Sequence, residues 1–180
     1  IAFVDFGLSR HLHLPDLLAE EFRLPMGTGP YMAPEQIFRI RDDRRSDIYA
    51  LGVLLYHLAT GVRPFGFPRN GRALRRRLWK DPVPPVTLAP GFPAWLQEII
   101  LRCLEVRSSQ RHASAAQLAH DLRNPSQTQL TARARRMQRS GFFATLRRKS
   151  ELPESLIDRA PESVAGHADA PIVAVAIDTQ

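Results

Sequence analysis

The sequence predicts a mainly α-helical domain that follows a short β-strand, and a second strand near the end of the chain where a second domain begins. Three observations support this prediction. Residues 48–62 form a long apolar run, residues 94–104 and 114–122 place apolar side chains at helical spacing, and residues 1–4 and 171–178 are apolar runs of strand length. Hydrophobic residues make up 44% of the chain and charged residues 24%, which is enough apolar material for a buried core.

At the front of the chain, residues 1–4 predict a strand and residues 5–30 predict a long loop. The front lacks the basic region of a signal peptide and does not resemble a natural start, so we expect the chain to be truncated there. The loop shows no sustained period and contains several glycines and prolines. Ordered loops of this length in compact domains usually have a function, which favours a binding or switching role here.

The apolar run predicts a helix that begins after Ser46 and ends at Gly61. Ser46 is a good N-cap, Asp47 lies in the first turn where the helix dipole favours a negative charge, and Gly61 is a suitable C-cap. Apolar residues occupy nearly every face through Leu58, so we expect protein to surround this helix. The run is shorter than the roughly 18–20 residues of a membrane span, and it contains His57, so no membrane span is expected.

Further helices are expected at 72–79, 94–104 and 114–122, with a proline-rich connector at 81–93. The basic run Arg72 to Arg77 favours a solvated helix face, and docking of acidic substrates is the alternative. We expect Cys103 to be a small core residue. Residues 130–139 are compatible with an Arg-rich helix that packs weakly, residues 150–170 with a linker, and residues 171–178 with a buried parallel strand.

Charge and cysteine content restrict the function classes. The net charge of +7 comes from 25 Lys and Arg against 18 Asp and Glu, and the basic residues concentrate at 69–80 and 123–149. These runs have little aromatic interleaving, so nucleic-acid binding is not favoured. The single cysteine excludes an internal disulfide framework and, with no ligand-like His spacing, argues against a zinc site. A reducing, cytoplasmic location is expected.

Three motifs are the candidates for a functional site. Asp5-Phe6-Gly7 follows the first strand, where a carboxylate can hold Mg²⁺ over nucleotide phosphates and glycine allows a sharp turn. The second motif, Gly27 to Glu35, ends in Ala33-Pro34-Glu35, and the third, Ser46 to Gly52, opens the apolar helix. In this combination and order they resemble the protein kinase family, with its DFG and APE signatures flanking the activation segment.

The resemblance covers residues 1–122 and implies the C-lobe of an α+β kinase fold. It implies an activation segment at 5–35 and a helical core at 36–122, followed by a basic helical extension at 123–149 and a linker at 150–170. Residues 171–180 resemble the first strand of a universal-stress-protein domain, in which Asp178 would lie near a bound nucleotide. By the same resemblance, Asp5 would bind the Mg²⁺ that accompanies ATP, with Phe6 and Gly7 completing that nucleotide site.

The resemblance also assigns roles nearer the substrate. Thr28 matches the threonine beside the catalytic aspartate of serine/threonine kinases, and Asp47 matches the buried aspartate that supports the catalytic loop. The stretch Gly27, Thr28, Gly29, Pro30 and Tyr31 would dock the protein substrate. Glu35 and Arg111 resemble the ion pair that ties the activation segment to the core. Arg107 and His112 depart from the family's usual residues around that arginine.

Several kinase parts are absent from the 180 residues, namely the glycine-rich loop, its lysine and the His-Arg-Asp catalytic loop. We therefore expect the parent protein to be a serine/threonine kinase that uses ATP and Mg²⁺, and this chain alone to be inactive. The alternative is a non-catalytic, pseudokinase-like scaffold joined to a stress-protein domain. Between Ser9 and Thr28 there is no Ser, Thr or Tyr, so we expect no phosphorylation switch in the middle of the loop. The substrates and the oligomeric state are left open.

Overall fold

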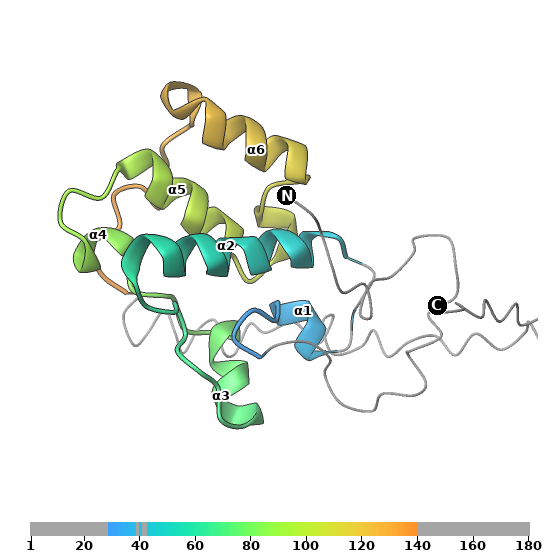
Figure 1. The fold of residues 1–180 in the computed structure, drawn as a ribbon. Helices are drawn as coiled ribbons and strands as arrows, with labels where there is room; N and C mark the ends of the chain where they lie inside the picture. Colours follow the sequence, from blue (N-terminus) through green and yellow to red (C-terminus); the bar gives the residue numbers. More distant parts are fainter. Residues whose placement is uncertain (1–28, 39, 41–42, 140–180) are drawn as a thin grey trace, which may run out of the picture.

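The structure is a computed structural model that describes residues 29–38, 40 and 43–139 (Figure 1). This part of the chain is helical and contains no strand. The predicted strands at 1–4 and 171–178, the linker and the stress-protein-like segment all lie outside the described residues. The α-helices are α1 (Pro34–Ile37), α2 (Arg45–Thr60), α3 (Gly71–Arg75), α4 (Pro85–Leu88), α5 (Ala94–Cys103) and α6 (Ala115–Arg123). Three 3-10 turns, η1 (Arg76–Leu78), η2 (Ser108–Gln110) and η3 (Pro125–Gln127), connect or follow them.

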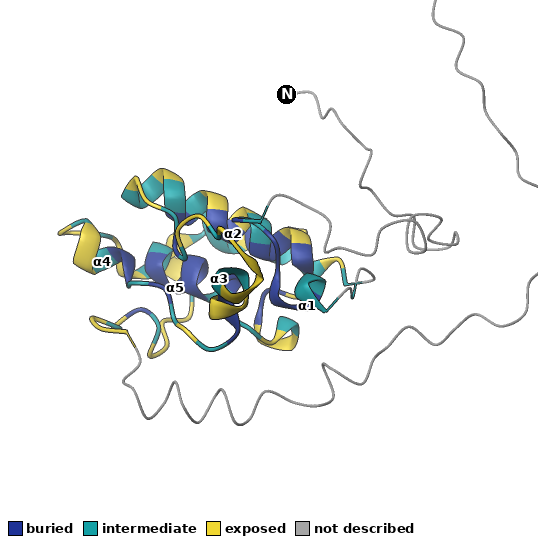
Figure 2. Cartoon of the chain, turned by 90° about the horizontal axis from the view of Figure 1, so that it is seen from below, coloured by how far each residue is buried: buried dark blue, intermediate teal, exposed yellow. Residues whose placement is uncertain are grey.

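Helix α2 is the central element of the described fold. In Figure 1 it runs across the middle, with α5 and α6 above it and α1 and α3 below. Its buried side chains pack in two clusters, the first with Ala33, Ile100 and Leu104 and the second with α5 and α6. The α2 members are Tyr49, Val53 and Tyr56 in the first cluster and Ile48 in the second. Figure 2 shows the resulting concentration of buried residues where the helices meet.

The N-terminus of α2 differs from the prediction. The helix begins at Arg45 and its N-cap is Arg44, so Ser46 lies inside the first turn and is buried. The Asp43 carboxylate instead accepts a 2.9 Å hydrogen bond from the backbone N–H of Arg45. Burial acts to raise the pKa of Asp43, but hydrogen bonds from Arg45 and Ser108 outweigh it and lower the pKa to about 2. The prediction for the C-terminus is confirmed, because Gly61 caps the helix at a φ of 74°.

One face of α2 is exposed in the described structure, contrary to the expectation that protein surrounds the helix. Leu51, Leu54 and Leu58 are 39%, 40% and 74% exposed. They lie three and four residues apart and therefore share one side of the helix. A hydrophobic stripe of this kind favours association or aggregation when nothing covers it.

Helices α5 and α6 confirm the periodicity of the sequence. Ser114 caps α6, and its Oγ accepts a 3.1 Å hydrogen bond from the N–H of Gln117. Cys103 is fully buried, as expected. The proline-rich connector contains one helix that was not predicted, α4, which begins at Pro85 because proline is well suited to a first helical position. None of the described helices is long and apolar enough to cross a membrane.

The segment from 128 to 139 corrects the prediction that residues 130–139 form a weakly packed, Arg-rich helix within a basic helical extension at 123–149. It contains a turn at residues 132–135 and no helix, and side chains of α5 hold it in place. The carboxylate of Glu98 accepts hydrogen bonds from the backbone N–H groups of Thr131 and Ala134 at 2.9 and 3.0 Å. The Gln97 amide donates to the carbonyls of Arg133, Ala134 and Arg136. Buried side chains of α5 thus replace the internal hydrogen bonds that a helix would have made.

We predict that Glu98→Ala releases this segment. The buried carboxylate also binds the Thr131 hydroxyl and Arg133, so its loss leaves several donors unpaired and costs the segment about 1–3 kcal/mol of local stability. Limited digestion with trypsin should show faster cleavage after Arg133, Arg135 and Arg136. The exposed Gln110→Ala variant is the control. Equal cleavage rates in both variants would contradict the prediction.

Candidate functional site

The described part of the site begins with an ion pair that joins residues 76 positions apart. The guanidinium of Arg111 donates to both carboxylate oxygens of Glu35, each at 2.7 Å. The side chains are 0% and 6% exposed respectively, so the pair is shielded from water. Such a bidentate arrangement fixes both distance and orientation. The sequence-based expectation that Glu35 and Arg111 pair is therefore confirmed.

Arg111 makes further contacts that hold it in place. Its guanidinium donates to the carbonyls of Arg45, Glu105 and Val106 at 2.8–3.1 Å. The guanidinium carbon Cζ of Arg111 also lies 5.0 Å from the centroid of the Tyr49 ring. These contacts join α1, the start of α2 and the loop after α5 at one point. The arginine therefore connects three parts of the chain that are far apart in sequence.

Ser46 has a role that sequence reasoning missed. Its hydroxyl donates a 2.7 Å hydrogen bond to Oε1 of Glu35, the oxygen that also accepts from Arg111. A serine before an apolar run predicts a helix cap, and nothing in that pattern indicates a hydrogen-bond partner eleven residues earlier. Tertiary packing brings the first turn of α2 against α1 and creates the contact.

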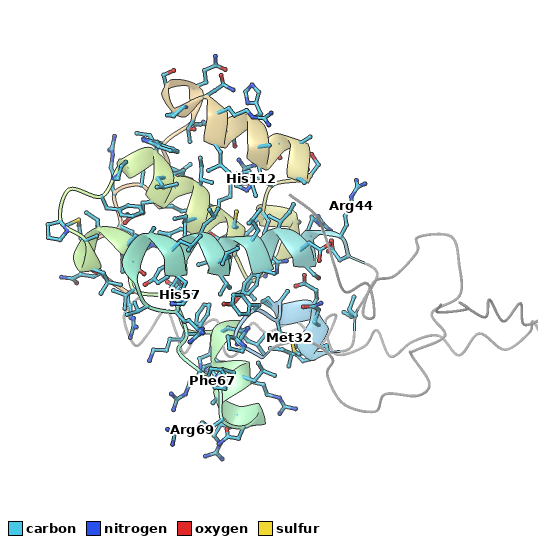
Figure 3. The ribbon with its side chains drawn as sticks, viewed as in Figure 1. Met32, Arg44, His57, Phe67, Arg69 and His112 are labelled. Atoms are coloured by element: carbon cyan, nitrogen blue, oxygen red, sulfur yellow. The ribbon has the colours of Figure 1, made fainter. Side chains whose placement is uncertain are left out.

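A second buried arginine, Arg77, was also missed, because the basic run around it predicted a solvated face. Arg72, Arg75 and Arg76 are exposed as expected, but Arg77 is only 1% exposed. Its guanidinium donates to the carbonyls of Gly29 at 2.8 Å and Pro30 at 3.3 Å, and also to that of Met32. Figure 3 shows Met32 beside α1 and α3. Arg77 therefore contacts the residues that were expected to dock the substrate.

Only some of the sequence-predicted site residues fall within the described structure. Gly29, Pro30 and Tyr31 form a turn that leads into α1, and Tyr31 packs against the first core cluster. Asp47 is exposed at the first turn of α2, and no described residue donates a hydrogen bond to its carboxylate. Desolvation raises the pKa of this carboxyl. The remaining predicted residues, Asp5, Phe6, Gly7, Gly27 and Thr28, lie outside the described part. No cluster of metal-ligating side chains occurs within the described part.

His112, which follows Arg111 in the sequence, is fully buried. Its Nδ1 lies 3.5 Å from Sγ of Cys103, and its Nε2 lies 3.2 Å from Oδ2 of Asp121. Burial lowers the pKa of His112 to about 4, the positive charge of Arg102 adds to this effect, and Asp121 opposes it. Burial also raises the pKa of the Cys103 thiol to about 12, so this Cys–His–Asp arrangement lacks the reactive thiolate of a nucleophilic site.

We predict that His112 makes the fold sensitive to mild acid. The folded pKa of about 4 lies below the usual value of 6.5, so the contribution of the neutral ring is complete above pH 6.5 and is lost as the pH falls from 6.5 towards 4. Urea unfolding midpoints at pH 7.5, 5.5 and 4.5 should therefore fall more steeply for the natural chain than for His112→Gln. The same pH dependence in both proteins would contradict this prediction.

Comparison with known proteins identifies the family. The model of the protein kinase domain matches residues 1–122, which is more than half of the chain. This chain belongs to the protein kinase domain family. The DFG and APE signatures, the Glu35–Arg111 pair and the central helix are thus parts of one domain, and the resemblance seen in the sequence is confirmed at the level of the family.

Curated kinase relatives of bacterial origin share the same region. The serine/threonine-protein kinase Pkn1 of Myxococcus xanthus is 35% identical over 159 residues, which is 86% of this chain and 22% of Pkn1. The serine/threonine-protein kinase PknB of Mycobacterium tuberculosis is 30% identical over 122 residues, which is 68% of this chain and 20% of PknB. The chain thus spans about a fifth of the length of these relatives.

Proposed function

We propose that this segment of the kinase domain serves a serine/threonine protein kinase, which transfers the γ-phosphate of ATP to serine or threonine hydroxyls of proteins. The observation that carries the proposal is the buried Glu35–Arg111 pair, because it anchors the end of the activation segment to the helical core. The similarity to Pkn1 and PknB, which are named as serine/threonine-protein kinases, supports the same residue specificity. Thr28 in the Gly27–Glu35 motif agrees with it.

The nucleotide and the metal belong to the same proposal. Asp5 supplies a carboxylate oxygen, which is the ligand type that Mg²⁺ prefers, and Gly7 permits the turn that follows. When bound, Mg²⁺ would neutralise charge on the ATP phosphates. The described residues have another task in this function. Arg111 and Glu35 fix α1, and the turn at Gly29, Pro30 and Tyr31 offers the surface next to which a substrate peptide would lie.

The experiment is a phosphate-transfer assay with the longest natural protein that contains these 180 residues. Incubation with labelled ATP, Mg²⁺ and casein should label serine and threonine of the casein, and Asp5→Asn should abolish the labelling. Residues 1–180 alone should transfer no phosphate, since the sequence lacks a catalytic loop. A longer protein that binds partners but lacks transfer with any protein acceptor would contradict the proposal and favour the scaffold alternative.

A further inference from the structure

Arg77 is a fully buried charge whose described contacts are all with neutral groups. Its side chain donates to four backbone carbonyls: Leu74 at 3.1 Å within its own helical region, and Gly29, Pro30 and Met32 from a segment more than 40 positions earlier. The guanidinium carbon Cζ of Arg77 lies 5.7 Å from the centroid of the Phe65 ring. Burial lowers the pKa of Arg77, which reflects the cost of removing a guanidinium from water.

The backbone carbonyls of the segment that Arg77 contacts accept hydrogen bonds from a donor elsewhere in the chain. Residues 29–31 form a turn, and Met32 precedes α1 without belonging to a helix or strand. Among the described residues, Arg77 is the hydrogen-bond donor to the carbonyls of Gly29, Pro30 and Met32. Because the guanidinium is planar and rigid, it sets the relative positions of the carbonyls that it binds. Removing it leaves these carbonyls free to turn towards other donors.

The Glu35–Arg111 pair does not perform this task. That pair fixes α1 from the side of α2, whereas Arg77 approaches from the 63–78 region. The same region meets the segment a second time, since a Cβ added at Gly29 would lie 3.2 Å from Cγ of Pro68. The turn at 29–32 is therefore shaped by the loop and helix that follow α2. Two anchors from different parts of the fold define the start and the end of residues 29–35.

We propose that Arg77 is a positioning residue that holds the Gly29–Met32 turn in the shape in which a protein substrate docks. The part of this inference that concerns substrate rests on the proposed kinase function. A buried charge surrounded by neutral partners is a poor means of stabilising a core, because an apolar side chain of similar size often serves the fold as well or better. The specific contribution of arginine here is the fixed geometry of three carbonyls.

The first test measures the turn itself by hydrogen exchange in the longest natural protein that contains this chain. Arg77→Met roughly keeps the side-chain volume and removes the guanidinium with its hydrogen-bond donors. Arg76→Gln is the control, because it removes an exposed charge from the adjacent position. We expect the amides of residues 31–33 to exchange about tenfold faster or more in Arg77→Met, because several charge-assisted hydrogen bonds are lost. The amides of α5 should keep the rate of the natural protein, as should both regions in Arg76→Gln.

Two results would overturn the proposal. Unchanged exchange at 31–33 would show that Arg77 does not hold the turn, and equal acceleration in the turn and in α5 would show that it supports only overall stability. Arg77→Lys provides a second variant in case the methionine variant fails to fold. It keeps the charge but lacks the planar fork, so it should protect residues 31–33 less well than arginine.

The second test separates positioning from general stability by kinetics. In the same protein, Arg77→Met should raise the KM for casein about tenfold or more and leave the KM for ATP unchanged, since the loss of several charge-assisted bonds is confined to the turn. Equal changes in both KM values, or none, would contradict a role in substrate docking. A natural protein without phosphate transfer would refute the kinase proposal, whereas the exchange experiment would still decide whether Arg77 holds the turn.

Discussion

Arg111→Ala is expected to lower the free energy of unfolding by about 3–5 kcal/mol, because it leaves the buried carboxylate of Glu35 without its partner. The cost is high since Ser46 alone would remain to bind Glu35, and the carbonyls of Arg45, Glu105 and Val106 would lose their donor. For a domain of this size the melting temperature should fall by at least about 10 °C. Thermal unfolding followed by circular dichroism measures the change.

Two further variants show whether the pair is the cause. Arg107→Ala removes a nearby charge that is exposed, so it should change stability by less than about 0.5 kcal/mol. The double variant Arg111→Met/Glu35→Leu replaces the pair by apolar groups and should recover part of the stability, because no charge is left unpaired. If the free energy of unfolding of Arg111→Ala lies within about 1 kcal/mol of that of the natural chain, the stabilising role of the Glu35–Arg111 pair is contradicted.

Gly52→Ala is expected to destabilise the chain by about 2–3 kcal/mol, despite a helix propensity gain of roughly 1 kcal/mol for replacing glycine inside a helix. A Cβ at position 52 would lie 2.4 Å from Cβ of Cys103 and 3.4 Å from its backbone carbonyl carbon. These atoms belong to the rigid part of α5, so the side chain cannot rotate away. Helices α2 and α5 would have to move apart, and urea unfolding would measure the loss of stability.

Matched variants distinguish this clash from a general effect of alanine. Gly71 lies at the start of α3 with nothing within 4 Å of an added Cβ, so Gly71→Ala should be neutral or slightly stabilising. Cys103→Ala should not rescue Gly52→Ala, because alanine keeps the Cβ that causes the clash. Cys103→Gly removes that atom and should relieve the clash. Rescue by Cys103→Ala, or full stability of Gly52→Ala alone, would contradict the close helix crossing.

The sequence by itself determined the family and most of the helical elements. Helical spacing of apolar residues predicted α5 and α6, and Gly61 predicted the end of α2, because capping and amphipathic periodicity are local properties. The order of the signatures from Asp5 to Gly52 predicted the kinase family, which the match over residues 1–122 confirms. The Glu35–Arg111 pair followed from that resemblance and could not have been found from spacing.

Tertiary structure alone decided which polar residues are buried and what they bind. The sequence pattern predicted Ser46 to be a helix cap, but its hydroxyl binds Glu35. It predicted a solvated face for the run that contains Arg77, but this arginine binds the 29–32 turn. It predicted a helix after residue 128, but Glu98 holds that segment in another conformation. Tertiary structure also left Leu51, Leu54 and Leu58 of the apolar helix α2 exposed in the described structure. The physical reason is common to these cases. A hydrogen bond or a contact between residues 11 to 48 positions apart depends on how helices pack, and local sequence patterns carry no information about that packing.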